Sequence, residues 1–132
     1  MSGETNLQSL LQNMSPKLNE GEYVFCTVEE LNAVDTKNII CFFKEKEGYT
    51  IIVEKSKADE LKLSYSYVAA WITLTVHSSL EAVGLTAAFS KALATDRISC
   101  NVVAAYYHDH IFVKKLDSEK AMEVLKNLSK QN

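Results

Sequence analysis

Apolar residues along this chain recur at two spacings, one typical of helices and one typical of strands. Near the N-terminus, four apolar residues follow the spacing i, i+3, i+4 and i+7: Leu7, Leu10, Leu11 and Met14. This spacing places their side chains on one face of a helix, so it predicts a helix over 7–14. Pro16, the only proline, ends that helix in the prediction, because the residue before a proline disfavours helical geometry.

Four runs in the following segment are rich in β-branched and aromatic residues, and they predict strands over 22–28, 38–43, 49–53 and 67–76. A charged turn that ends in Gly48 joins the second and third runs into a hairpin. A short helix is predicted over 56–61, between the third run and the fourth. The fourth run has no charged residue on either face, which indicates a central strand that is covered on both sides.

A second helix pattern follows directly after the fourth strand. Ser78 and Glu81 have the spacing of a capping box, in which the serine caps the helix and the glutamate is its third residue. We therefore expect a helix from Ser78 to about Ala94. A strand over 98–106, a turn over 107–110 and a strand over 111–113 come next, and a last helix is predicted after Asp117.

The order of predicted elements indicates an α+β fold of two fused ferredoxin-like units. The second half reads as a βαββαβ unit that lacks its last strand, and the first half resembles the same unit without its first strand. Two such halves that complete each other account for all the elements. We therefore predict antiparallel sheets with helices packed on one face, and a division of the sequence into 1–64 and 65–132.

Composition and charge restrict the class of partner. The chain has 132 residues, 47% hydrophobic, with a formal net charge of −3 and no run of lysine or arginine. This composition argues against nucleic acid and anionic membranes as partners. The longest apolar run is half the length of a membrane span, and the N-terminus has no features of a secretory signal. Three cysteines in strand-like runs, without a C-x-x-C pair, indicate reduced thiols and a cytoplasmic protein: Cys26, Cys41 and Cys100.

Most polar residues that could carry chemistry lie in two turns. At the first turn, over 77–84, a helix start offers free backbone N–H groups and a positive dipole end, which suit a carboxylate or a phosphate. Ser78 and Ser79 add hydroxyls there, and Gly84 leaves space for a ligand or another segment of backbone. The alternative is that Ser78 only caps the helix and no ligand binds.

The second turn contains His108, Asp109 and His110, and the third histidine of the chain, His77, lies in the first turn. A metal site would need these side chains to converge with a fourth ligand, and the alternation of 108 and 110 argues against it. In one interpretation the turn is only structural; in the other, Asp109 supplies a fixed anion for a ligand's ammonium group. No G-x-S-x-G, P-loop or paired-carboxylate motif appears, so we predict no enzyme activity and no cofactor.

Several segments resemble the small tandem ACT-domain proteins of bacteria, which are related to the ACT modules of CASTOR-type arginine sensors. The resemblance covers nearly the whole chain and is carried by 7–16 and 21–26 in the first half and by 77–86, 98–102 and 107–113 in the second half. It implies two ACT units, a homodimer, and the binding of an amino acid or a similar small molecule at the strand-to-helix turn and the later hairpin. The ligand-binding residues that it implies are Ser78, Ser79, Leu80, Glu81, Val83, Gly84, His108, Asp109 and His110.

Three hypotheses follow for the function. The first is a non-catalytic regulatory protein that binds an amino acid. The second is an ACT-like module that assembles with another protein and binds no ligand. The third is a metal-dependent or hydrolytic enzyme that uses His77, His108 and His110.

Overall fold

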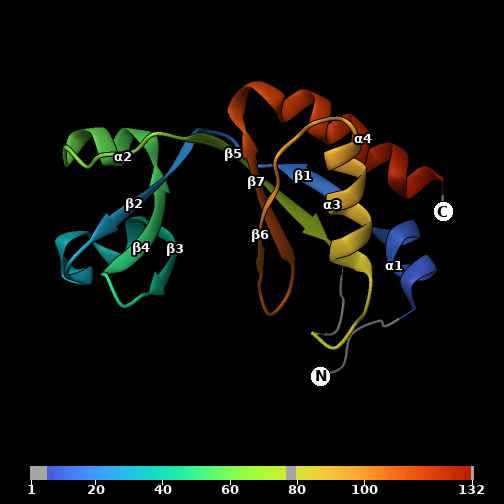
Figure 1. Cartoon of the computed structure of the whole chain (residues 1–132), viewed down its shortest axis with the longest axis horizontal. Helices are drawn as coiled ribbons and strands as arrows, with labels where there is room; N and C mark the ends of the chain where they lie inside the picture. The colour runs from blue at the N-terminus through green and yellow to red at the C-terminus, as the bar shows by residue number, and fades with distance from the viewer. Residues whose placement is uncertain (1–5, 77–79, 132) are drawn as a thin grey trace. The chain divides into compact units, whose positions relative to one another are not determined.

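The computed structural model of the chain describes residues 6–76 and 80–131 (Figure 1). The chain forms two compact units. The first contains the described residues of Met1–Glu20 and Ala70–Asn132, and the second contains Gly21–Ala69. Each unit is described below by itself.

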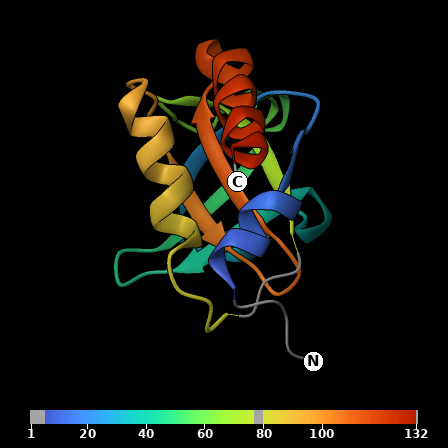
Figure 2. The ribbon, with the colours of Figure 1, turned by 90° about the vertical axis from the view of Figure 1, so that its right-hand side faces the viewer.

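The first unit combines a four-stranded sheet with three helices. Its strands lie in the order β1, β5, β7, β6, and the pairs β1–β5 and β6–β7 are antiparallel. The elements are α1 (Leu7–Asn13), β1 (Ser15–Leu18), β5 (Val68–Thr75) from Ala70 on, α3 (Leu85–Thr95), β6 (Asn101–Ala104), β7 (Asp109–Lys114), the 3₁₀ turn η3 (Lys115–Asp117) and α4 (Ser118–Lys130). Figure 2 shows α1, α3 and α4 together in front of the strands of this unit.

The core of the first unit lies between those helices and the sheet. Alternate residues of β5 turn the same face toward the helices, and Ala70, Ile72 and Leu74 are fully buried on it. Phe89 and Leu93 of α3 lie one turn apart and join the same cluster. This packing fixes the start of α3 beside the sheet, which is where the candidate site lies.

The second unit is a smaller sheet with one helix. Its strands lie in the order β3, β4, β2 and the first two residues of β5, and each of these pairs is antiparallel. The elements are β2 (Tyr23–Val28), the 3₁₀ turns η1 (Leu31–Ala33) and η2 (Thr36–Asn38), β3 (Ile39–Lys44), β4 (Tyr49–Glu54) and α2 (Lys55–Glu60). Two 3₁₀ turns thus stand between β2 and β3, where a ferredoxin-like unit has its first helix. Residues of β2, β4 and α2, among them Val24, Ile51 and Ala58, form a separate buried cluster.

The predicted α+β class, with antiparallel strands and helices on one face, is confirmed. The two halves also complete each other, as the element order predicts. Strand β1 from the first half pairs with β5 in the first unit, and Val68 and Ala69 pair with β2 in the second unit. The predicted boundary at 64/65 concerns the division of the sequence and stays a prediction, whereas in space residues 6–20 join the second half.

Three parts of the fold differ from the prediction. The hairpin turn predicted over 107–110 lies earlier in the sequence, because β6 ends at Ala104 and β7 already begins at Asp109. Strand β1 was not expected, because it has four residues and contains Pro16, which is tolerated at the edge of a sheet. The predicted helix start at Ser78 is wrong: α3 begins at Leu85, and Gly84 is its N-cap, without a capping side chain. Glu81 therefore is not the third residue of the helix. Ser78 and Ser79 lie outside the described residues.

Candidate functional site

A small pocket in the first unit lies where the start of α3 meets strands β6 and β7. It has a volume of about 130 Å³ and is open to solvent. Three segments line it: the loop before α3, the first residues of α3, and the paired ends of the two strands. The lining residues are Leu80, Ala82, Gly84, Leu85, Thr86, Ala104 and Asp109.

Asp109 is the charged residue of this pocket. It is the first residue of β7, pairs with Ala104 on β6, and is only 8% exposed. The salt bridges found among the described residues lie elsewhere, so the Asp109 carboxylate has no ion-pair partner in that part of the chain. Burial raises the pKa of its carboxyl group above the usual range. A buried carboxylate of this kind favours a bound cation such as an ammonium group.

The N-terminus of α3 brings a partial positive charge to the pocket, opposite in sign to the Asp109 carboxylate. The first hydrogen bond of this turn runs from the Ala88 N–H to the Gly84 carbonyl, over 2.9 Å. The N–H groups of Leu85, Thr86 and Ala87 therefore have no acceptor within the helix. Among the described residues, the first turn contains no acidic side chain and Gly84 makes no side-chain cap, so this positive end suits an anion such as a carboxylate.

Gly84 shapes the entrance to the helix. Its φ angle of +100° lies in the left-handed region, which residues other than glycine rarely adopt. A Cβ atom at this position would also lie 3.1 Å from Cδ2 of Leu7 on α1. The close approach that the sequence indicated at Gly84 is therefore an approach to α1, and Gly84 also lines the pocket.

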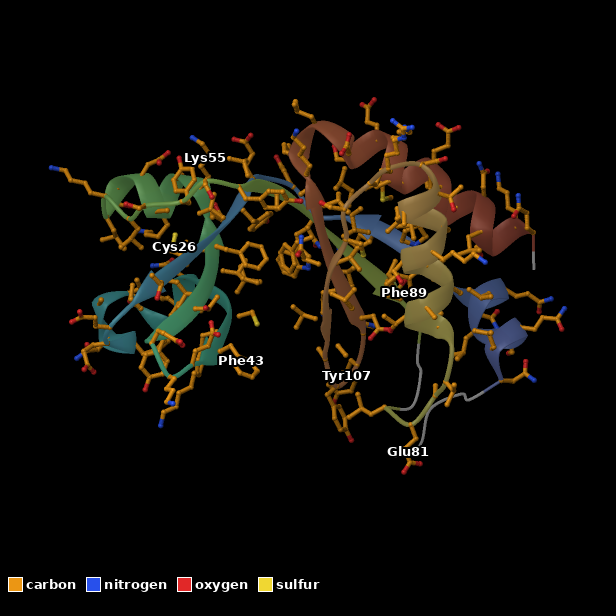
Figure 3. The ribbon with its side chains drawn as sticks, in the orientation of Figure 1. Cys26, Phe43, Lys55, Glu81, Phe89 and Tyr107 are labelled. Atoms are coloured by element: carbon orange, nitrogen blue, oxygen red, sulfur yellow. The ribbon has the colours of Figure 1, made fainter. Side chains whose placement is uncertain are left out.

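The residues predicted for the site fall into three groups. Leu80, Gly84 and Asp109 line the pocket together. Glu81 and Val83 are exposed and do not line it, and Figure 3 shows the Glu81 side chain pointing away from the protein. The residues of the pocket that the sequence did not predict are Ala82, Leu85, Thr86 and Ala104. Recognising Gly84 as the N-cap would have found Leu85 and Thr86, whereas Ala104 comes to the pocket only through its pairing with Asp109.

His108 and His110 do not line the pocket. His110 follows Asp109 directly on β7, and consecutive residues of a strand point to opposite faces, whereas His108 precedes the strand. The two rings are 6.3 Å apart, and Trp71 Nε1 donates a hydrogen bond to His110 Nδ1 over 3.0 Å. An indole N–H can only donate, so this nitrogen of His110 carries no proton. Thr73 Oγ1 lies 3.1 Å from the same nitrogen. Burial, and then the neighbouring His108, lowers the pKa of His110.

This depressed pKa predicts a loss of stability in acid. Below the unfolded-state value of about 6.5, the unfolded chain binds a proton that the folded His110 does not, so the free energy of unfolding decreases as the pH falls. One such group contributes at most about 1.4 kcal/mol per pH unit. We expect urea unfolding between pH 7.5 and 5.5 to show a smaller decrease for His110→Asn than for the parent chain. An equal decrease in both would contradict the assignment to His110.

The described part of the chain offers no obvious metal site and no membrane span. No group of three or more histidine, cysteine, aspartate or glutamate side chains in it is arranged to hold a metal ion. No helix among the described residues is long and apolar enough to cross a bilayer.

Two models of the ACT domain match this sequence, one over residues 2–70 and the other over 66–127. The chain therefore belongs to the ACT-domain family and carries two ACT domains in tandem. Among curated proteins, none matches this sequence.

Solved structures agree with this assignment. A protein of unknown function from Vibrio cholerae, described as a possible transport protein, is 49% identical, with a TM-score of 0.85 over 93% of this chain and 95% of that chain. The ligand-free regulatory subunit of aspartate kinase from Thermus thermophilus is 9% identical, with a TM-score of 0.61 over 86% of this chain and 95% of that one. The aspartokinase α and β subunits are 12% identical, with a TM-score of 0.62 over 86% and 96%. The last two show the fold alone, and that fold confirms the predicted ferredoxin-like architecture.

Proposed function

We propose that this chain is a non-catalytic regulatory protein that binds an amino acid, or a small molecule with the same two charges, in the pocket beside Asp109. The observation that supports this proposal most strongly is the buried carboxylate of Asp109, which lines the pocket and has no ion-pair partner among the described residues. A ligand ammonium would compensate this charge, and the desolvated setting would strengthen the interaction.

The start of α3 is suited to bind the second charged group of the ligand, its carboxylate. An α-carboxylate that accepts hydrogen bonds from the N–H groups of Leu85 and Thr86 would lie in the same pocket as Asp109. Leu80, Gly84 and Asp109 are the predicted site residues that fit this arrangement. Ser78 and Ser79 precede the described part of the loop, and they stay candidates for further contacts to the carboxylate.

A regulatory role fits the chemistry of the pocket better than catalysis. Among the described residues that line it, Thr86 is the only one besides Asp109 with a reactive polar side-chain atom, and none is a histidine, cysteine or lysine. A nucleophile with an adjacent base is therefore missing from this lining. We propose that the protein acts in the cytoplasm through a ligand-dependent change in its contacts.

The test is a thermal-unfolding screen of the intact chain against the twenty amino acids. Ligand at about one hundred times its dissociation constant stabilises the folded state by about 2.7 kcal/mol. For a domain of this size, that stabilisation raises the unfolding temperature by a few degrees. No shift with any amino acid at millimolar concentration would contradict the proposal.

The second candidate is a module that assembles with a second copy of the chain. Strand β3 is an edge strand of the second unit, and its outer edge presents backbone groups that no neighbouring strand of that sheet pairs. Two adjacent aromatic residues on it, Phe42 and Phe43, are exposed by 49% and 71%. They lie on alternate faces, so both faces of this edge are apolar. A two-fold pairing of two β3 strands would be self-complementary and would cover both side chains.

This candidate predicts a dimer that depends on β3. We expect Phe43→Lys to weaken the dimer at least tenfold, because the lysine would be desolvated in the joint sheet, and light scattering across a concentration series measures this change. Leu116→Lys is the matched control, since Leu116 is 86% exposed in the first unit. Equal dimerisation of both variants and the parent chain would exclude β3 as the interface.

A further inference from the structure

A second open groove in the first unit extends along the exposed side of α4, next to the end of β1. Figure 2 shows α4 in the foreground of this unit. The groove has two apolar side chains, Leu18 of β1 and Met122 of α4, and the rest of its lining is polar. We call it the α4 groove; the residues that α4 contributes to it are Glu119, Met122, Glu123, Lys126, Asn127 and Lys130.

The four charged residues of the α4 groove are exposed, whereas the opposite face of the helix is buried in the core. Glu119 and Glu123 are four residues apart, and so are Lys126 and Lys130, so each pair lies on the same side of the helix and carries like charges. Such pairs slightly destabilise an isolated helix. None of the four belongs to an ion pair found among the described residues. A partner with the opposite charges would therefore compensate them.

The lining residues of α4 are arranged symmetrically about the middle of the helix. Each residue before the midpoint of 119–130 has a counterpart at the same distance after it: Glu119 with Lys130, Met122 with Asn127 and Glu123 with Lys126. A second α4 that packs antiparallel about this midpoint would place each glutamate level with a lysine of the partner. One register thus pairs all the charges. The helix dipole favours glutamate near the start and lysine near the end, but it does not require them to share one face.

We infer that the α4 groove binds the same groove of a second copy of this chain, with the two helices antiparallel about a two-fold axis. A two-fold contact joins identical surfaces, so the surface must be complementary to itself, as the charges of α4 are. Leu18 and Met122 supply the apolar part of the contact, and the charged pairs set its orientation. The α4 groove shares no lining residue with the pocket beside Asp109, so the inference is independent of the proposed ligand.

The first test is the salt dependence of self-association. Exposed ion pairs contribute little individually and are screened by salt, so we expect a weak, salt-sensitive dimer. Sedimentation of the intact chain should show a dimer in low salt, and about 1 M salt should weaken it at least tenfold. A chain that remains monomeric at about 1 mM in low salt would overturn the inference.

The sharper test exchanges the charges of one half of the helix. Glu119→Lys with Glu123→Lys, and separately Lys126→Glu with Lys130→Glu, should each weaken the dimer at least tenfold, because every charge then faces a like charge. An equimolar mixture of the two double variants should restore a dimer at least as tight as that of the parent chain. Where circular dichroism shows that a double variant does not fold, the single changes Glu123→Lys and Lys126→Glu provide the same test at the central pair.

The matched control is Lys114→Glu with Lys120→Glu, which changes the net charge as much as Lys126→Glu with Lys130→Glu does. Both positions are exposed and lie outside the α4 groove, so the dimer should stay within twofold of the parent. An equal loss in this control, or a mixture that does not restore the dimer, would overturn the inference. Loss of the dimer in Phe43→Lys alone would also overturn it and would assign the dimer to β3 in the second unit.

Discussion

Asp109→Asn should weaken ligand binding about 30-fold or more while it stabilises the chain in the absence of ligand. The amide keeps the shape of the side chain but removes the negative charge that the ligand ammonium requires. Loss of one partner from a buried charge pair costs about 2–5 kcal/mol, and about 1.4 kcal/mol corresponds to a tenfold change in affinity. Titration calorimetry with the best amino acid of the screen measures this effect.

Asp109→Asn should stabilise the free chain because the Asp109 carboxylate is buried without an ion-pair partner among the described residues. Burial raises its folded-state pKa above the unfolded value, so the charged form at neutral pH costs stability. This cost disappears as the pH falls toward the unfolded value of about 3.9. We expect Asp109→Asn to raise the free energy of unfolding at pH 7 by about 0.5–2 kcal/mol, with a smaller gain in acid.

Glu81→Gln is the matched control for both measurements. Glu81 lies in the sequence between two residues of the pocket lining, Leu80 and Ala82. It is itself exposed and does not line the pocket. The family resemblance implies both Glu81 and Asp109 as ligand-binding residues. If Glu81→Gln lost affinity and Asp109→Asn did not, the ligand would lie outside the pocket described here.

Phe89→Ala should lower the free energy of unfolding by about 3–5 kcal/mol, the usual cost of removing a large aromatic side chain from a core. Phe89 is fully buried in the middle of α3, and Figure 3 shows it among the side chains between that helix and the strands. It packs in one cluster with Ile72 and Leu74 of β5. Urea unfolding followed by circular dichroism measures the change.

The comparison variant is Phe43→Ala, because Phe43 is 71% exposed in the second unit. A surface substitution of this kind usually changes stability by less than about 0.5 kcal/mol. Phe89→Ala should also lower the affinity for the ligand, because α3 supplies the positive end of the pocket. Similar stabilities of the two variants would contradict the assignment of Phe89 to the core.

The sequence predicted those parts of the fold that local periodicity determines. Strands β2, β4 and β5 have alternating or uniformly apolar patterns, and the structure places them close to the predicted ranges. Strand β1 escaped prediction because four residues around Pro16 carry no such pattern, and only the pairing with β5 makes them a strand. The start of α3 was misplaced because a capping-box spacing at Ser78 outweighed Gly84, whose role depends on its left-handed backbone.

The candidate site was predictable only in part, because some of its residues are brought together by tertiary packing and not by a local sequence pattern. Asp109 was predicted because a carboxylate between two apolar runs is conspicuous and matches the family resemblance, although the structure places it at the start of β7 and not in the turn. Ala104 and Leu85 carry no chemical signal of their own, and they reach the pocket through strand pairing and helix packing. The adjacent histidines were predicted beside Asp109, but the alternation of β7 places His110 against Trp71 instead.

The most direct test of the account is a nuclear magnetic resonance titration of the intact, ¹⁵N-labelled chain with the amino acids of the screen. If the pocket binds the ligand, the largest amide shifts should fall on Gly84, Leu85, Thr86, Ala104 and Asp109, and Asp109→Asn should abolish them at the same ligand concentration. Shifts that are largest in the second unit, or that persist unchanged in Asp109→Asn, would contradict the assignment of ligand binding to this pocket.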